Sequence, residues 1–350
     1  MDKRPPLPGG GRRVGMLALV LWLAGCVVPP GPLDPAGAQD TAAGSPATPA
    51  PEVYDGYTEP PAPLPAWGYF LRKIAPDVYF FSTGYYNTLF LVSTDGVILV
   101  DPLRGAGLSL RKAIEQVTPL PVKVIIYSHA HLDHIGDAHL FAKSARIIAH
   151  EVARNRLLRY RDPRRPIPQI SFRRNFTLNF GGKRVELKYP GRGHGAGNIL
   201  IHLPAEKVLM FVDVGAPRSV PGKGFEAEDL YGQVQGLKKA LELDFEIWVA
   251  GHMQRPGARG ELRQVLQYYY DSRKAGKEAL RRVTFESVAA TLRSHDPQYR
   301  LERYHQAVAQ ACYAKLLPVW KPRLMGFEAY AKSHCAAWMQ FHLTEKAPRP

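Results

Sequence analysis

Three histidines and one aspartate stand close together near the middle of the chain. They are His129, His131, Asp133 and His134, and they directly follow residues 122–126, a β-branched run that predicts a buried strand. Residues two apart on an extended backbone share a face, so His129 and His131 are placed to bind one metal ion together. Where the chain turns, Asp133 and His134 can face a second position. A single histidine is ordinarily structural, but this cluster is hard to explain as packing, and we interpret it as metal-binding.

Three later residues with metal-ligating side chains stand where strands end or loops begin. His194 lies in a glycine-rich loop, which leaves room for a ligand side chain. Asp213 follows an apolar strand, where it could also cap the following turn. His252 comes after Gly251 at the end of another strand. We expect all three to be metal ligands, although each has a structural alternative.

The elements that must position these residues form two series of short strands with helices between them. We predict strands over 77–81, 88–92, 97–100, 122–126, 146–149, 176–180, 185–188, 199–203, 208–212 and 245–250. Helical spacing occupies 108–117, 138–143, 151–160 and 227–243, and then 279–292 and 301–317 in a mainly helical tail. Asp296-Pro297 and Pro318 mark expected breaks in that tail. Mostly antiparallel strands in two sets predict two packed sheets covered by helices.

The motif His129-x-His131-x-Asp133-His134 resembles the signature of the metallo-β-lactamase superfamily. His194, Asp213 and His252 follow in the order and context of that family, and the resemblance covers residues 70 to 255. It implies an α/β (α+β) fold, a four-layer αβ/βα sandwich with metals at the sheet edges. The chain departs from the family at Val212, where glycine is common before the aspartate.

Family roles are carried over residue by residue. The resemblance implies that His129, His131 and His194 hold a first metal and that Asp133, His134 and His252 hold a second, with Asp213 bridging both. Imidazole and carboxylate ligands without thiolate suit two zinc ions, and the same set tolerates iron or manganese. Zinc lowers the pKa of water to about 7, so a metal-bridging hydroxide would be the nucleophile and Asp133 the catalytic residue that orients it and moves its proton.

The expected function is a zinc-dependent hydrolase that cleaves an ester, thioester, lactone or amide-type bond of a small molecule. The bridging Asp213 is more typical of thioesterase, lactonase and phosphodiesterase members of the family than of true β-lactamases. A β-lactamase, which an exported location would suit, and a phosphodiesterase remain alternatives. A catalytically silent envelope protein that binds a partner is the alternative outside enzymes.

The beginning of the chain predicts export. Residues 1–25 combine a basic start with an apolar run too short to span a bilayer, as in a secretory signal peptide. Leu23-Ala24-Gly25-Cys26 resembles the lipobox of bacterial lipoproteins, which implies a lipidated Cys26 and a protein held on a membrane of the periplasm or cell envelope. A plain secretory signal is the alternative. Residues 26–66 read as a Pro/Ala-rich linker, 67–258 as the catalytic domain and 259–350 as a helical C-terminal extension.

The remaining cysteines and charges add two expectations. In an oxidising compartment, Cys312 and Cys335 are a candidate disulfide, with two free thiols as the alternative. The net charge of +15 permits nucleic-acid binding, but an exported protein rarely meets nucleic acid, so we expect none and read the basic groups as solvated faces or contacts to anionic lipid. The run Tyr268–Tyr270 could edge the active site but is more typical of a core.

Overall fold

The structure is a computed structural model, and it describes residues 62–345. The described residues belong to one compact unit, Tyr54–Pro350. The predicted signal peptide, Cys26 and nearly all of the predicted linker lie outside the described residues. Within the described part, no helix has the length and apolar character needed to cross a membrane.

The first sheet has seven strands in chain order. They are β1 (Phe70–Ala75), β2 (Val78–Ser82), β3 (Asn87–Ser93), β4 (Gly96–Val100), β5 (Val122–Ile126), β6 (Arg146–His150) and β7 (Ile170–Phe172). Neighbours from β1 to β4 pair antiparallel, and those from β4 to β7 pair parallel. The parallel strands β4 to β7 must be joined by crossover connections. The connection from β5 to β6 carries the motif His129–His134.

The second sheet has six strands in the order β13-β12-β11-β10-β9-β8. They are β8 (Asn175–Phe180), β9 (Lys183–Lys188), β10 (Leu200–Leu203), β11 (Val208–Met210), β12 (Ile247–Val249) and β13 (Gly257–Ala258). The β11–β12 pair is parallel and the others are antiparallel. The predicted hairpins 176–188 and 199–212 are confirmed.

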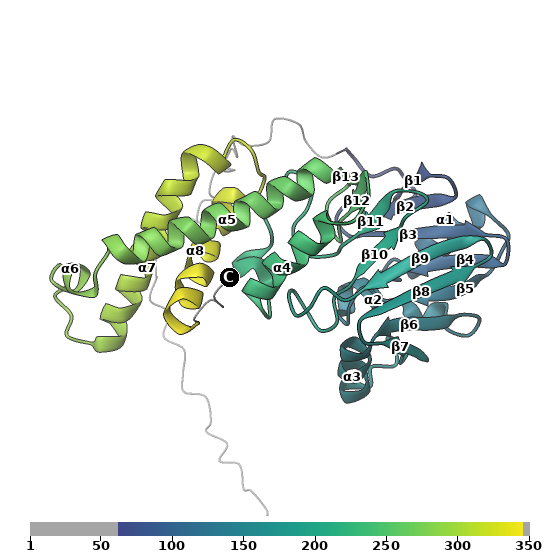
Figure 1. The fold of residues 1–350 in the computed structure, drawn as a ribbon, viewed down its shortest axis with the longest axis horizontal. Coiled ribbons are helices and arrows are strands. Elements are labelled where there is room, and N and C mark those ends of the chain that lie inside the picture. The colour runs from purple at the N-terminus through teal and green to yellow at the C-terminus, as the bar shows by residue number, and fades with distance from the viewer. Residues whose placement is uncertain (1–61, 346–350) are drawn as a thin grey trace, which may run out of the picture. The chain divides into compact units, whose positions relative to one another are not determined.

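Helices occupy the connections and the C-terminal third of the chain. They are α1 (Gly107–Val117), α2 (Leu132–Ile135), the 3-10 turn η1 (Ala138–Leu140), α3 (Glu151–Tyr160), the 3-10 turn η2 (Lys223–Glu226), α4 (Leu230–Leu241), α5 (Arg259–Arg282), α6 (Phe285–Ala289), α7 (Pro297–Trp320) and α8 (Phe327–Thr344). Figure 1 shows α5 running from the second sheet to the helices of the tail.

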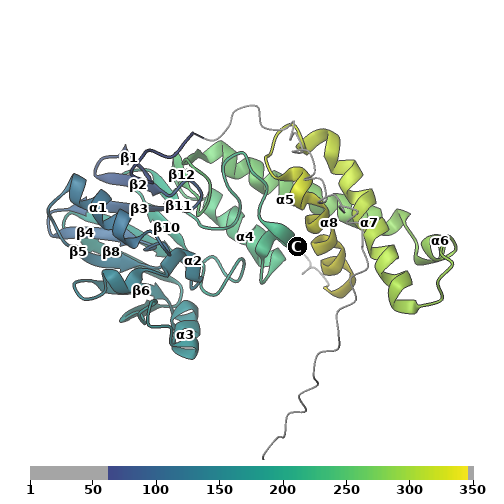
Figure 2. The same cartoon turned by 180° about the vertical axis from the view of Figure 1, so that it is seen from behind.

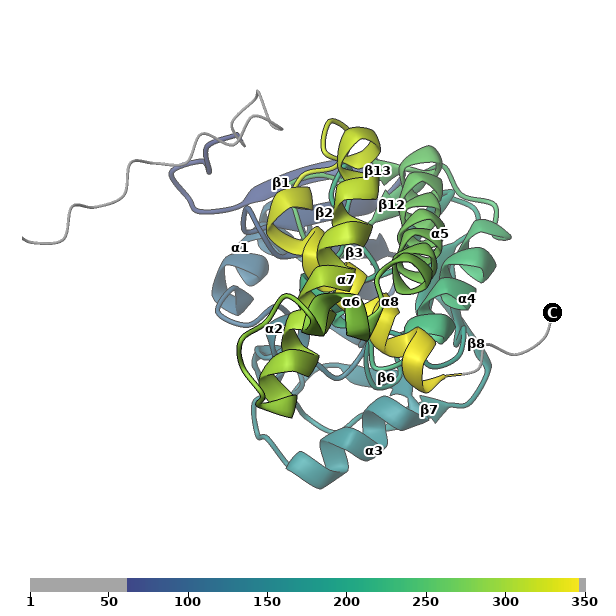
Figure 3. The ribbon, with the colours of Figure 1, turned by 90° about the vertical axis from the view of Figure 1, so that its left-hand side faces the viewer.

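The two sheets pack face to face, with helices on both outer sides. Alternation along each strand divides the apolar residues between the faces: Phe80 and Leu89 lie between the sheets, whereas Phe81 and Phe90 pack with α1 on the outer side of the first sheet. Helix α1 covers that outer side (Figure 2). Helices α4 and α5 lie on the opposite side (Figure 3). The predicted four-layer αβ/βα sandwich with a helical C-terminal extension is therefore confirmed.

The outer side of the second sheet and the helical tail share one core. Trp248 of β12, Leu237 of α4, Leu262 of α5 and Trp338 of α8 are all fully buried members of a single hydrophobic cluster. The predicted boundary between 258 and 259 coincides with the start of α5, but the packing continues across it.

Four predictions for the helical parts were wrong in detail. The helix predicted over 138–143 is only the 3-10 turn η1 (Ala138–Leu140). The helix predicted over 279–292 is divided, because α5 ends at Arg282 and Thr284 caps the separate α6. Pro318 does not end α7, which continues to Trp320, since a proline so near the end of a helix disturbs little of it. The helix predicted over 227–243 begins only at Leu230, after Asp229 caps it.

Candidate metal centre

The first four candidate ligands leave β5 at the sheet edge, as predicted. His129 and His131 follow the strand, and His131 is the N-cap of the short helix α2, whose first turn carries Asp133 and His134. His129 is completely buried, and its Nδ1 lies 2.9 Å from Ser128 Oγ. That contact fixes the ring and leaves Nε2 pointing toward the other candidates.

The three later candidates reach the same place from the second sheet. His194 lies in the loop after β9, Asp213 follows β11, and His252 follows β12. Asp213 has a φ of 60°, in the left-handed region that aspartate tolerates better than most residues. The amide Nδ2 of Asn198 donates a 2.8 Å hydrogen bond to the Val212 carbonyl and so helps to hold this turn. Val212, which stands where the family commonly has glycine, therefore does not move Asp213 away from the other candidate ligands.

Asp213 is the centre of the cluster. Its Oδ2 lies 2.9 Å from His134 Nε2, 3.2 Å from His194 Nε2 and 3.5 Å from His129 Nε2. Its Oδ1 lies 3.1 Å from His252 Nε2. One buried carboxylate thus faces histidines of both candidate sets with its two oxygens.

The seven side chains form two groups, each with ligand atoms within 4.8 Å of one another. The first group is His129, His131, His194 and Asp213, and the second is Asp133, His134 and His252. His194 Nε2 and His131 Nδ1 are 3.1 Å apart, and Asp133 Oδ2 and His134 Nε2 are 3.5 Å apart. The structure therefore brings together all of the predicted ligands. Asp213, which the resemblance implied would bridge both sets, falls in the first group and also lies 3.1 Å from His252 of the second.

Unpartnered atoms in this cluster test whether it fits metal ions. His129 Nε2, His134 Nε2 and Asp213 Oδ1 are buried, and their close contacts within the cluster, such as 2.9 Å from His134 Nε2 to Asp213 Oδ2, do not have the geometry of hydrogen bonds in the described part of the chain. A buried polar atom without a partner costs roughly 1–3 kcal/mol, so three at one point are expected only where something else binds them. Nitrogen and carboxylate donors in groups of three or four match the ligand chemistry of zinc. The residues fit the metal ions that the sequence predicts.

The site also has glycines where any side chain would fill the ligand space. A Cβ on Gly251 would overlap Asp213 Oδ1 and lie 2.8 Å from His134 Cε1. A Cβ on Gly195 would lie 2.9 Å from His131 Nε2. Close packing around the ligands thus depends on the absence of a side chain at these positions.

The protonation of most of the cluster suits cation binding. His134 is the exception: burial would lower its pKa, but the charge of Asp213 outweighs burial and raises the pKa to about 9, so this ring must release a proton to bind a metal. Burial, followed by the charge of His194, lowers the pKa of His131 to about 4. Burial also lowers the pKa of His129 well below its usual value. Burial alone would raise the pKa of Asp213, but the surrounding histidines outweigh it and hold that pKa well below the usual range. Neutral imidazoles and an ionised carboxylate are the forms that bind metals.

Sequence reasoning did not assign Asp101 to the site, although it placed Asp101 at the end of a strand. Its Oδ1 accepts a 2.7 Å hydrogen bond from the backbone N–H of Ser128, next to His129, while its Oδ2 is buried without a partner. Burial raises the pKa of Asp101 to about 7. No sequence signal marks Asp101, because its φ of 39° is a property of the folded chain.

A cavity of about 350 Å³ opens beside the second group. Tyr85 and Tyr86 flank His252, with ring centroids 4.9 Å away in both cases. Burial, and after it the nearby Tyr330 and Glu226, raise the pKa of Tyr85. This aromatic wall was not predicted from the sequence.

The tyrosine run on α5 does not edge the cavity. Tyr268 and Tyr269 are fully buried, and the Tyr269 hydroxyl donates a 3.2 Å hydrogen bond to the Val214 carbonyl, next to Asp213. The core interpretation of this run is therefore correct, and the run supports the site from behind.

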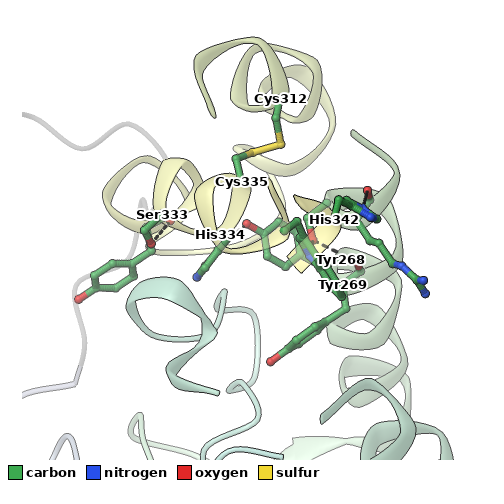
Figure 4. Close-up of a disulfide and its surroundings, with 11 residues drawn as sticks. Tyr268, Tyr269, Cys312, Ser333, His334, Cys335 and His342 are labelled. Atoms are coloured by element: carbon green, nitrogen blue, oxygen red, sulfur yellow. Dashed lines mark hydrogen bonds between the residues drawn. A yellow bond between two sulfur atoms is a disulfide. The ribbon is translucent and has the colours of Figure 1, made fainter. Parts of the chain in front are cut away.

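The two candidate cysteines are bonded in the tail. A disulfide joins Cys312 of α7 to Cys335 of α8, with a Cα–Cα distance of 5.8 Å (Figure 4). Both cysteines are completely buried, and neither lies in the metal cluster.

Comparison with known proteins finds similarity to one family. The family model described as the metallo-beta-lactamase superfamily matches residues 82–252. The α subunit of 2,4-dinitroanisole O-demethylase from Nocardioides sp. (strain JS1661) is 31% identical over 52% of this chain and 57% of that protein. The metallo-beta-lactamase type 2 of Bacillus cereus is 30% identical over 41% of this chain and 52% of that protein. The chain thus spans little more than half the length of these relatives.

Solved structures support the same fold. A metallo-beta-lactamase from Pontibacter korlensis superposes with a TM-score of 0.51 at 21% identity, covering 57% of this chain and 99% of that one. At this identity the likeness concerns the fold alone.

Proposed function

Because residues 82–252 belong to the metallo-β-lactamase superfamily, we propose that this chain is a hydrolase that uses two bound zinc ions to cleave an ester, thioester, lactone or amide-type bond of a small molecule. The observation that carries this proposal is the convergence of seven ligand side chains from both sheets into two adjoining groups. Iron or manganese would suit the same donors.

Two sets of residues would hold the two ions. His129, His131 and His194 would hold the first ion, and Asp133, His134 and His252 the second. Asp213, which faces both sets, would bind both ions. When bound, the ions supply positive charge that makes water reactive at neutral pH and polarises the bond to be cleaved.

Asp133 is the chain's candidate proton carrier. Its side chain is 37% exposed and lines the cavity, whereas Asp213 is almost completely enclosed. A carboxylate that faces both the ligands and the open space can accept a proton from water and pass it to the leaving group. Tyr85 and Tyr86 shield the His252 side from bulk water.

The decisive experiment combines metal analysis with a substrate panel. The full chain, purified with zinc, should contain two metal ions and hydrolyse at least one of a thioester, an aryl ester, a lactone, a phosphodiester and a cephalosporin. Asp133→Ala should lower the rate by at least about 100-fold, since positioned acid–base catalysis contributes about 10²–10⁴-fold. Asp95→Ala, which removes an exposed carboxylate on the β3–β4 turn, should leave it unchanged. Fewer than one metal per chain would favour the silent envelope protein instead.

Two relatives justify additional members of the panel. Similarity to proteins named metallo-beta-lactamase type 2 keeps β-lactam hydrolysis as the second candidate function. Both subunits of 2,4-dinitroanisole O-demethylase are similar to this chain, at 31% and 25% identity, so 2,4-dinitroanisole, a neutral aromatic ether, is included as well.

The proposed setting is the bacterial periplasm or cell envelope, with the protein anchored to a membrane through lipid on Cys26. The support comes from the sequence, where a basic and then apolar leader ends in Leu-Ala-Gly-Cys. In bacterial cells, Cys26→Ser should move the protein from the membrane fraction to the soluble fraction. If wild type and variant fractionate alike, the anchor is refuted, while the hydrolase proposal is unaffected.

A further inference from the structure

The cavity beside the metal ligands is closed on one side by a wall that is built partly from residues beyond the matched family domain. Besides site residues, the cavity is lined by Ser219, Val220 and Glu226 of the segment before α4, and by Met325 and Tyr330 at the start of α8. The last two belong to the helical tail, more than 70 residues after the family match ends at 252. The part of the wall that Met325 and Tyr330 form therefore lies outside the matched family domain.

Backbone hydrogen bonds join the two segments of the wall, the one before α4 and the one at the start of α8. Met325 N–H donates to the Arg218 carbonyl at 2.8 Å, and Val220 N–H donates to the Met325 carbonyl at 3.0 Å. Gly224 N–H donates to Ser333 Oγ at 2.8 Å, so α8 also holds the turn η2. Both segments of the wall thus keep one arrangement relative to each other.

The turn η2 places one carboxylate at the cavity. Gly224, Phe225 and Glu226 have φ values of 64°, 66° and 48°, three consecutive residues in the left-handed region. Such a backbone persists only where its surroundings enforce it. Here Phe225 is completely buried, with its ring centroid 4.2 Å from that of His334 and 4.5 Å from that of Tyr269. A Cβ on Gly222 would overlap the Glu226 carboxylate, so the glycine makes room for that side chain.

Apart from the proposed metal ions, the charged groups that line the cavity are all negative. Its lining contains the carboxylates of Asp133, Asp213 and Glu226, and no lysine or arginine among the residues that the structure describes. Asp133 and Asp213 face the metal ligands, whereas Glu226 has no ion-pair partner within the described chain and stands with Tyr85 and Tyr330. Aromatic faces beside an unpaired carboxylate attract cations and accept neutral apolar groups, and they repel anions.

We propose that Glu226 and Tyr330 are specificity-determining residues. They select substrates whose non-reacting end is a neutral or cationic group, such as an aromatic ring or an alkylammonium group, and they reject substrates whose non-reacting end is anionic. This inference rests on the proposed hydrolase function and adds the substrate class. The reacting bond faces the metal ligands, and the far end of the substrate packs on Tyr85, Met325 and Tyr330, beside Glu226.

The test uses the zinc-loaded full chain and three phenyl esters that differ only in the end of the acyl chain: trimethylammonium, tert-butyl or carboxylate. The wild type should hydrolyse the first two at least about fivefold faster in kcat/KM than the third, the factor expected for one charge pair at contact in water. Glu226→Gln should lower the ratio of the cationic to the anionic ester by at least about fivefold.

A matched pair of tyrosines tests the wall itself. Tyr330→Ala should raise KM for the tert-butyl ester about fivefold relative to phenyl acetate, because the larger acyl chain loses an aromatic contact. Tyr270→Ala is the control: Tyr270 has the same exposed fraction, 38%, but does not line the cavity. Equal effects of the two substitutions would overturn the role of Tyr330.

Binding separates this inference from the hydrolase proposal. Calorimetry with the three corresponding ketones, which cannot be hydrolysed, should give the same order of affinity and the same change in Glu226→Gln. If no ester is cleaved but the ketones bind in this order, the hydrolase function fails and the selectivity stands. If the esters are cleaved at equal rates and Glu226→Gln changes neither ratio, the selectivity fails and the hydrolase function stands.

Discussion

The buried His334 predicts how the stability of the protein depends on pH. Its Nε2 lies 2.8 Å from the Gly222 carbonyl, which can only accept, so Nε2 carries the proton. Its Nδ1 must then accept the 2.8 Å hydrogen bond from the Tyr268 hydroxyl. The neutral ring is therefore hydrogen-bonded at both nitrogens. Burial lowers the pKa of His334 from 6.5 to about 4.

The sign of the effect follows from the lowered pKa. As the pH falls below 6.5, the unfolded chain takes up a proton before the folded chain does, which stabilises the unfolded state. The stability contributed by neutral His334 is therefore complete above pH 6.5 and is lost progressively as the pH falls toward 4. At about 1.36 kcal/mol per pH unit, the free energy of unfolding should drop by about 1.8 kcal/mol between pH 7 and pH 5 because of this residue alone.

The assay compares urea unfolding of the wild type and His334→Gln at pH 7 and pH 5. Glutamine offers a donor and an acceptor but does not ionise, and the other titrating groups, including the metal-ligand histidines, are common to both proteins and cancel. The variant should therefore lose about 1.8 kcal/mol less than the wild type over this interval. If both proteins lose the same amount, His334 is not buried in its neutral form, and the packing of α8 on η2 is misassigned.

Two further substitutions test the site and the tail. Gly251→Ala should lose at least one bound metal ion per chain in elemental analysis, because its Cβ would overlap Asp213 Oδ1. Gly260→Ala is the control and should keep all of its metal, because nothing lies within 4 Å of its Cβ position. A fully metallated Gly251→Ala would contradict the ligand geometry. Replacing Cys312 and Cys335 together by alanine should lower the free energy of unfolding by about 3.4 kcal/mol, as expected for a bond that closes a segment with a sequence separation of 23, and should leave metal content unchanged. A loss below about 1 kcal/mol would mean that the tail keeps its order without the bond.

The candidate ligands were predictable because their signal is local. His129 and His131 follow a strand that β-branched residues make evident, and each later ligand stands at a strand end or in a glycine-rich loop. Their convergence is not a local property. It was predicted only because the order of the motifs resembles a known family, and spacing alone would have left His194 and Asp213 with structural alternatives.

The features that were missed depend on contacts distant in sequence. Nothing near Phe225 announces a left-handed turn, because the burial of its ring against His334 and Tyr269 imposes that conformation. Asp101 acts through Ser128, 27 residues later. Pro318 was expected to end its helix, but α7 continues to Trp320, and the sequence alone does not show where the helix ends.

Part of the wall that closes the cavity, Met325 and Tyr330, lies far in sequence from the strands that carry the ligands. Substitutions at Met325 or Tyr330 alter the space offered to a substrate without touching any residue that holds Asp213 or the histidines in place. Tyr330 thus lies apart in sequence from the residues that would hold the metal ions, whereas Glu226 lies between Asp213 and His252. Related proteins could exchange one kind of substrate for another through drift in the tail alone, and directed evolution of this protein has a natural place to begin.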